Sequence, residues 1–480
     1  SSALDGKIPI DINIDYGTLL TAACYILGIL TMIFLPKIIT WAQRIATGVA
    51  LVSAIGFFLP LPDDILRRKL HGDFAGAIRL IDRRLADTAT PRAMRYCLEV
   101  HKEMLRRLPG EFPYSCHEAL DIIQKNIPDF TREELEELID GRWIRWIYID
   151  GEIRIFKRFY STLCKAMAGF AERVGAHMQG IESATEDSEE DYFLDRTIQK
   201  MKEQGSVTNR IRVRATVKLK DEHFVPGMFM RAHLPIPAAC QQQSDIRIEK
   251  IWPEAAQIAP EDAPQRTICW EETMVENHEF DVEYSYLHTA KYNEVYGKTG
   301  LCTDLSCDTD EQAPHIVFTP YIKALCAELT EGLTDPLSKA QVFYDFITKN
   351  MNYTFMPGYF VLENIADSCA RNHTGDCGVF ALLFITLCRC AGIPAQWQSG
   401  LTAEPDFIGG HDWVRFYAEP FGWIFADPSY GVSAARTRNE ERRQFYFGNL
   451  DPYRFVANSA FMTNFTIPKE HWRADPYDNQ

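Results

Sequence analysis

A long apolar run that begins directly after a glycine-flanked cysteine constrains this chain more than any other feature. The run, Val379–Cys390, contains a single charged residue and predicts a helix, and Gly375-Asp-Cys-Gly378 stands at its mouth. At a helix start the first backbone N–H groups have no intrahelical partner, and the helix dipole is positive. Both effects stabilise negative charge. We therefore expect the pKa of the Cys377 thiol to be lowered and its sulfur to be a nucleophile near neutral pH.

Two segments further along the chain supply a histidine and an aspartate. Residues 411–417 alternate with a period of two and predict a strand, and residues 422–427 predict a second strand after the turn signal Glu-Pro-Phe-Gly. A hairpin folded about residue 419 places His411 opposite Asp427, with Cβ atoms about 5 Å apart. The aspartate can then orient the imidazole while its other nitrogen faces Cys377. The alternative for each residue alone is an inert core cysteine or a packed histidine.

Five stretches carry a family resemblance: residues 339–353, 375–378, 387–395, 410–413 and 425–431. With them, the region from Pro320 to Asn458 resembles the transglutaminase-like superfamily, whose members have a papain-like core. The resemblance implies that Cys377 is the nucleophile, His411 the general base and acid, and Asp427 the orienting carboxylate.

The resemblance also implies a reaction through an acyl-enzyme. The Cys377 thiolate attacks a carbonyl, the histidine protonates the departing amine, and water or an amine resolves the thioester. We expect a hydrolase of peptide or other amide bonds. A true transamidase, or a non-catalytic peptide- or glycan-binding module, are the alternatives. The Cys377 N–H would be one oxyanion donor, and Asn372 and Tyr359 are candidates for the second. The sequence indicates no cofactor and no metal site.

The domain prediction is an α+β protein in which a β-sandwich domain and an N-terminal helical domain precede the papain-like core. Thr131 with Glu134 has the pattern of a helix-capping pair, and Asp150-Gly151 is a hairpin turn signal. Several alternating segments after residue 206 predict the sandwich. The predicted boundaries are residues 1–62 for a membrane hairpin, 63–182 for the helical domain with a β-hairpin, 183–205 for an acidic linker and helix, 206–300 for the sandwich and 301–480 for the catalytic domain.

Charge and hydropathy bear on partners and location. The formal net charge of −16 argues against nucleic acid, which requires a basic face, so we expect a peptide, protein or other amide-bearing substrate. Tyr16–Pro36 and Ile45–Pro62 carry no charged residue, and their lengths suit two membrane spans. A helical hairpin buried in a soluble core is the alternative. The distribution of lysine and arginine favours the cytoplasmic side for the catalytic part, and thirteen cysteines without a regular spacing suit a reducing compartment.

Overall fold

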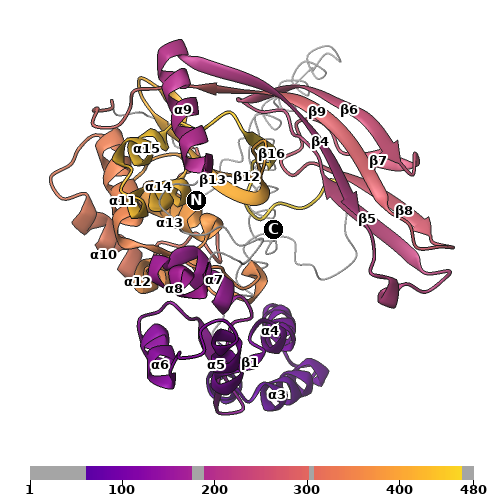
Figure 1. The fold of residues 1–480 in the computed structure, drawn as a ribbon. Coiled ribbons are helices and arrows are strands. Elements are labelled where there is room, and N and C mark those ends of the chain that lie inside the picture. Colours follow the sequence, from indigo (N-terminus) through magenta and orange to yellow (C-terminus); the bar gives the residue numbers. More distant parts are fainter. Residues whose placement is uncertain (1–60, 176–188, 302–306, 468–480) are drawn as a thin grey trace, which may run out of the picture.

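The computed structural model describes residues 61–175, 189–301 and 307–467, which form a mixed α and β protein (Figure 1). Helices come first, strand-rich sheets follow, and a compact mixed domain completes the chain. Within these residues no helix combines the length and the apolar character needed to cross a bilayer. The predicted spans Tyr16–Pro36 and Ile45–Pro62 lie outside the described residues, apart from Leu61 and Pro62.

The first part of the chain is helical, with one small sheet. Its sequence signals form the local structures expected of them: the Thr131 side chain accepts the Glu134 N–H in a capping box, and Asp150 and Gly151 both have positive φ in the turn of the hairpin. The helices are α2 (Asp63–Leu70), α3 (Phe74–Ala86), α4 (Arg92–Glu111), α5 (Cys116–Gln124), α6 (Arg132–Asp140), α7 (Phe159–Ala166) and α8 (Ala168–Val174). The strands are β1 (Tyr114–Ser115), β2 (Trp146–Ile149) and β3 (Glu152–Ile155), in the order β1-β3-β2.

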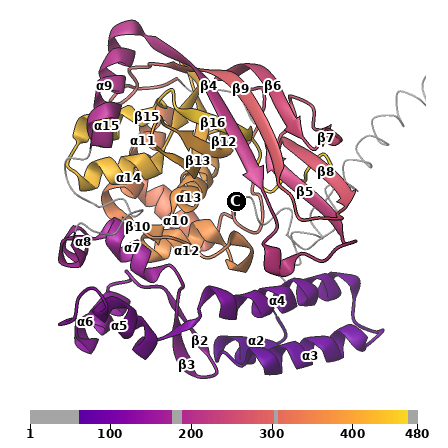
Figure 2. The ribbon, with the colours of Figure 1, turned by 45° about the vertical axis from the view of Figure 1, so that its right-hand side comes forward.

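Helix α9 (Glu189–Gln204) leads into two three-stranded sheets. One has the order β4-β9-β6 and the other β5-β8-β7 (Figure 2). Apolar side chains from both sheets, such as Val213, Trp270 and Tyr284, share one core. Phe455 and Ala457 from the last strand of the chain join that core, so the sandwich is anchored to the C-terminal domain. The strands are β4 (Ser206–Val217), β5 (Phe229–Pro235), β6 (Gln243–Trp252), β7 (Ala256–Ile258), β8 (Thr267–Thr273) and β9 (Phe280–Lys291), with a short helix η1 (Asp221–His223).

The C-terminal domain is built around the apolar helix predicted from the sequence. Helix α13 (Cys377–Cys390) is buried from Cys377 to Cys388 and packs against a five-stranded sheet of order β15-β14-β13-β12-β16. Burying each large aliphatic or aromatic side chain stabilises the fold by about 1.5–3 kcal/mol, so this helix is the centre of the domain. The other elements are α10 (Pro320–Leu329), α11 (Pro336–Asn350), β10 (Asn352–Tyr353), η2 (Tyr359–Val361), α12 (Ile365–Asn372), β11 (Thr374–Gly375), β12 (Ala395–Ala403), β13 (Ile408–Ala418), β14 (Gly422–Ala426), α14 (Pro428–Arg436), α15 (Glu440–Phe445), β15 (Phe447–Gly448) and β16 (Arg454–Asn458).

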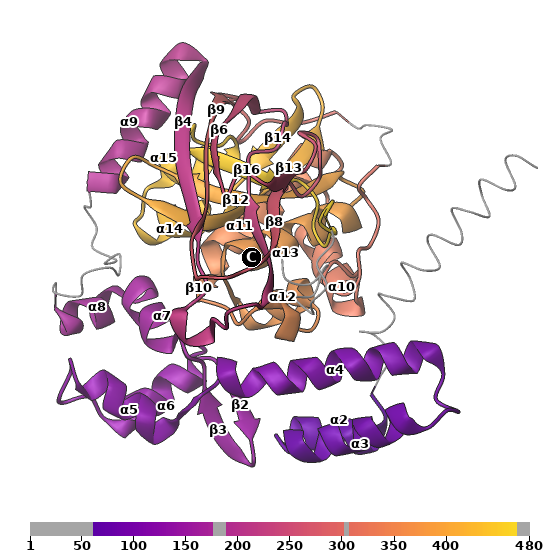
Figure 3. The ribbon, with the colours of Figure 1, turned by 90° about the vertical axis from the view of Figure 1, so that its right-hand side faces the viewer.

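The N-terminal helices lie along one side of this domain (Figure 3). Phe360 and Val361 of η2 are buried in the same apolar cluster as residues of α2, α3 and α4. Beside the hairpin, Arg145 Nη2 donates to Thr374 Oγ1 at 2.8 Å, two residues before Asp376 in sequence. The helical part therefore contacts the segments that lead into α13.

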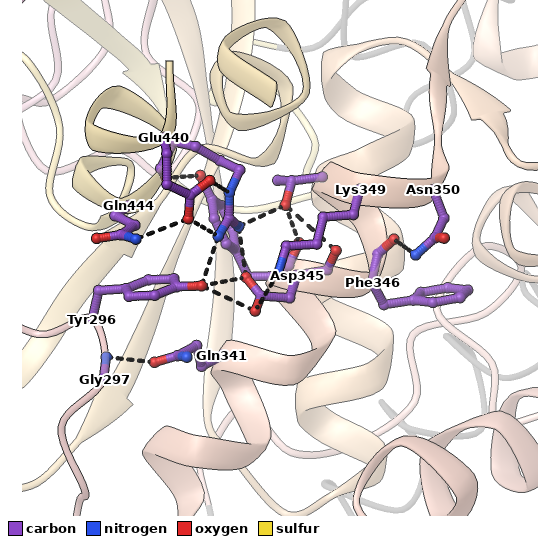
Figure 4. Close-up of polar contacts among 12 residues, drawn as sticks. Tyr296, Gly297, Gln341, Asp345, Phe346, Lys349, Asn350, Glu440 and Gln444 are labelled. Atoms are coloured by element: carbon purple, nitrogen blue, oxygen red, sulfur yellow. Dashed lines mark hydrogen bonds and ion pairs between the residues drawn. The ribbon is translucent and has the colours of Figure 1, made fainter. Parts of the chain in front are cut away.

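A buried arginine holds the C-terminal helices together (Figure 4). Arg443 of α15 is only 1 % exposed, and its guanidinium donates to Asp345 of α11 at 2.6 Å, to Glu440 Oε1 at 2.6 Å and to Tyr296 Oη at 2.6 Å. Tyr344 Oη in turn donates to the Arg443 carbonyl at 2.6 Å. This network fixes α15 on α11 and so supports α14, the helix between them in space and the one that follows Asp427.

Candidate active site

Cys377 is the first residue of α13, and the residues around it fix the helix start. Asp376 is the N-cap: its Oδ1 accepts the Val379 N–H at 3.1 Å and the Tyr359 hydroxyl at 2.6 Å. A Cβ added at Gly378 would lie 2.2 Å from Tyr359 Oη and 2.7 Å from Asp412 Oδ2. Only glycine fits there, because η2 and β13 both approach the first turn of the helix. This close approach explains the glycine that follows the cysteine.

His411 and Asp427 are joined by a hydrogen bond of 2.7 Å between Nε2 and Oδ2, and both side chains are buried. Asp427 is also the N-cap of α14, where its Oδ1 accepts the Tyr430 N–H at 3.0 Å. The carboxylate is therefore held at both oxygens. With Nε2 engaged, Nδ1 is the ring nitrogen that remains for proton exchange.

The pairing of β13 with β14 differs by two residues from the predicted hairpin. Ala418 pairs with Gly422 and Val414 with Ala426, so Asp427 lies just beyond the last paired residue of β14. The predicted direct opposition of His411 and Asp427 is wrong. In this register Asp427 faces a position two residues away from His411. Residues two apart in a strand share a face of the sheet, so the two side chains are diagonal neighbours and still meet.

Arg454 of β16 completes the surroundings of Asp427 and was not anticipated from the sequence. It is fully buried, with Nη1 2.9 Å from Asp427 Oδ2, and its Nε donates to Asp451 at 2.9 Å. Burial by itself would raise the pKa of Asp427, but the charges of His411 and Arg454 outweigh burial and lower that pKa. Asp427 is therefore an ionised acceptor. No sequence signal links Arg454 to the hairpin, since it comes from a separate strand.

The sulfur of Cys377 contacts Asp412, the residue that follows His411. Cys377 Sγ lies 3.4 Å from Asp412 Oδ2, and the Asp412 backbone N–H also bonds to the sulfur. Among the described residues the side-chain hydrogen bond of Cys377 is to Asp412 and not to His411. The sulfur therefore sits against the His411–Asp412 peptide of β13.

The environment of the sulfur reverses the predicted shift of its pKa. Burial raises the pKa of the Cys377 thiol well above its usual value, and the carboxylates of Asp412 and Asp376 raise it further. The expectation of a lowered pKa is wrong for the structure as it stands. Two nearby negative charges and removal from water outweigh the favourable effect of the helix start.

The two candidates for the second oxyanion donor differ in whether their side chains reach the site. Asn372 is exposed, and its amide donates to the Ser368 carbonyl at 2.9 Å, one turn back in its own helix, so it does not reach the site. Tyr359 is buried against the helix start, with its hydroxyl engaged by Asp376. Trp397 of β12, which the sequence analysis missed, lies against Gly378, and within the described part of the chain its buried Nε1–H has no acceptor.

Across residues 61–175, 189–301 and 307–467, no group of three or more His, Cys, Asp or Glu side chains is arranged to hold a metal ion.

Comparison with known proteins bears on this arrangement. Residues 323–428, which contain Cys377, His411 and Asp427, match the family described as the transglutaminase-like superfamily. This core is transglutaminase-like. No curated protein matches the chain.

Among solved structures, the chain is similar to a "Putative Cysteine Protease" from Cytophaga hutchinsonii, with 16% identity, a TM-score of 0.36, and coverage of 47% of this chain and 78% of the other. It is also similar to the periplasmic domain of TgpA from Pseudomonas aeruginosa, with 16% identity, a TM-score of 0.26, and coverage of 47% of this chain and 76% of the other.

Proposed function

We propose that this chain is a thiol enzyme of the transglutaminase-like class that hydrolyses peptide or other amide bonds through Cys377, His411 and Asp427. The observation that carries the proposal is the buried 2.7 Å bond between His411 and Asp427, in a strand whose next residue, Asp412, contacts the cysteine at the first position of a buried helix. An ionised carboxylate behind an imidazole is the arrangement that stabilises the imidazolium formed when a thiol gives up its proton.

The proposed reaction uses each group at a stated atom. His411 takes the thiol proton at Nδ1 while Nε2–H stays bonded to Asp427. The thiolate attacks the amide carbonyl, and the oxyanion forms near the Cys377 N–H, which has no acceptor within the first helical turn. The imidazolium then protonates the departing amine. Water then attacks the thioester. This step releases the carboxylic acid product and regenerates the Cys377 thiol.

The nucleophile can be tested without knowing the natural substrate. Incubation with p-nitrophenyl acetate should release p-nitrophenolate and leave one acetyl group on the Cys377 peptide, as seen by mass mapping. Cys377→Ala should abolish the acetylation, while Cys388→Ala should not, because Cys388 lies deep in the same helix and is fully buried. Acetylation that persists in Cys377→Ala, or that never occurs on the wild-type protein, would argue for a binding module instead.

Hydrolysis and transamidation share every step up to the acyl-enzyme, so a further arm of the same experiment separates them. After acetylation, a primary amine such as glycine ethyl ester is added and the products are identified. We expect free acetate as the main product over the range of amine concentrations. Amide as the main product at low amine would identify a transamidase.

A further inference from the structure

The side chain in contact with the candidate nucleophile is a carboxylate that the triad does not use. Asp412 Oδ2 lies 3.4 Å from Cys377 Sγ, and both residues are buried, Asp412 with 4 % of its surface exposed and Cys377 with 7 %. The Asp412 backbone N–H also bonds to the sulfur, so the residue contacts the sulfur at two points. A thiolate formed here would face a second negative charge with little water between them.

Close packing holds the Asp412 carboxylate in this position. Its Oδ2 lies 2.7 Å from the place where a Cβ of Gly378 would be, so the absence of a side chain at 378 creates the space it occupies. The Asp412 main chain is fixed by pairing of β13 with β12, in which Asp412 is opposite Ser399. The contact is therefore built into the fold at the start of α13.

The other ionisable groups around the sulfur do not take over this role. Asp376 also faces it, but its carboxylate accepts the Tyr359 hydroxyl and the Val379 N–H and feels the positive charge of Arg145. Burial raises the pKa of Tyr359, which is buried, and of Tyr353, which is half-buried, so both phenols stay neutral; Arg158 acts on Tyr353 from the helical part. His411 is the remaining group, and it is the proton acceptor of the proposed reaction.

We propose that Asp412 is a fourth catalytic residue, which keeps Cys377 in the thiol form while its carboxylate is ionised and allows thiolate formation when that carboxylate is neutralised. In the resting state the S–H donates to Oδ2. When a proton binds Asp412, the thiol proton can move to His411 Nδ1, which gives a thiolate beside an imidazolium and a neutral carboxylic acid. The enzyme is thereby activated by acid. The inference rests on the proposed function for Cys377 as the nucleophile and for His411 as its proton acceptor.

The test measures, at a series of pH values, the rate at which iodoacetamide modifies Cys377. Mass mapping identifies the modified cysteine. Asp412→Asn keeps the shape and removes the charge, so at neutral pH it should react at least tenfold faster than the wild type. As the pH falls, the wild-type rate should approach that of the variant, because protonated aspartic acid and asparagine are both neutral. Asp406→Asn is the matched control: it makes the same charge change at an exposed position beside β13 and should leave the rate unchanged.

The outcomes separate the inference from the proposed function. If Asp412→Asn reacts more slowly than, or as slowly as, the wild type at neutral pH, then Asp412 does not restrain the sulfur and the inference is overturned. If His411→Ala has no effect on acetylation by p-nitrophenyl acetate, the proposed function fails instead. Should Asp412→Asn not fold, the wild type alone decides: an alkylation rate of Cys377 that only falls on acidification contradicts the inference.

Discussion

Replacement of Asp427 by asparagine tests the proposed site, because the two carboxylate oxygens have different partners. Oδ1 caps α14 at the Tyr430 N–H, while Oδ2 accepts from His411 and faces Arg454. Asparagine has a single oxygen, so one set of partners must face the NH₂ group. The imidazole donor and the Arg454 cation converge at Oδ2, whereas a single backbone donor binds Oδ1. We therefore expect the amide oxygen to turn toward His411 and Arg454 and the cap of α14 to be lost.

This orientation sets the size of the expected effects. The imidazole keeps its tautomer and its hydrogen bond, but the imidazolium no longer bonds to a negatively charged acceptor, and a hydrogen bond of that kind is worth about 1.5–3 kcal/mol. That corresponds to roughly a 10- to 150-fold decrease in the rate of acylation. Loss of the N-cap should lower the free energy of unfolding by about 0.5–2 kcal/mol. The opposite orientation would impose the wrong tautomer and would decrease the rate by about 10⁴-fold.

The assay is the burst of p-nitrophenolate from p-nitrophenyl acetate, with denaturant unfolding of the same sample. Asp451→Asn is the matched control, because Asp451 also binds Arg454, while its other hydrogen bonds come from the Tyr446 hydroxyl and the Tyr453 N–H and not from His411. It should lower stability yet change the acylation rate by less than about threefold, since it removes no bond to the imidazole. An Asp427→Asn enzyme with undiminished acylation would falsify the role given to this carboxylate, and a 10⁴-fold loss would refute the argument from Arg454.

Two other substitutions probe the surroundings of the site. Arg454→Met should lower the free energy of unfolding by about 3–5 kcal/mol, because it leaves Asp427 and Asp451 buried without their shared cation. The pKa of Asp427 is lowered in the folded state. The stability that this carboxylate contributes is therefore present above its pKa in the unfolded chain and is lost as the pH falls through its pKa in the folded protein. In Arg454→Met, urea titrations should show this loss beginning at a higher pH. Arg145→Met should slow acetylation of Cys377 roughly three- to tenfold, because the Asp376 carboxylate beside the sulfur loses a neutralising positive charge. Arg145→Lys should restore most of the rate in the same burst assay, whereas equal losses in both variants would point to a packing defect.

Much of the C-terminal domain could be predicted because its signals are local. The apolar run after Gly378 must be buried, so the start and length of α13 follow from the residues themselves. The capping pair at Thr131 and the turn at Asp150-Gly151 likewise act within a few residues. The alternation after His411 predicted a strand for the same reason. The contact between His411 and Asp427 was predicted as well, although from a direct opposition that the structure does not have.

Tertiary structure decided what depends on residues far apart in the chain. The turn signal marked where β13 and β14 reverse but not which residues close the hairpin, so the predicted register was off by two. Helix polarity alone predicted a lowered pKa for Cys377, yet the fold brings Asp412, 35 positions away, against the sulfur and removes both from water. Arg454 reaches Asp427 from β16 for the same reason. A local pattern determines what a side chain can do, whereas the charges that surround it, and hence its pKa, are set by which strands the fold places beside it.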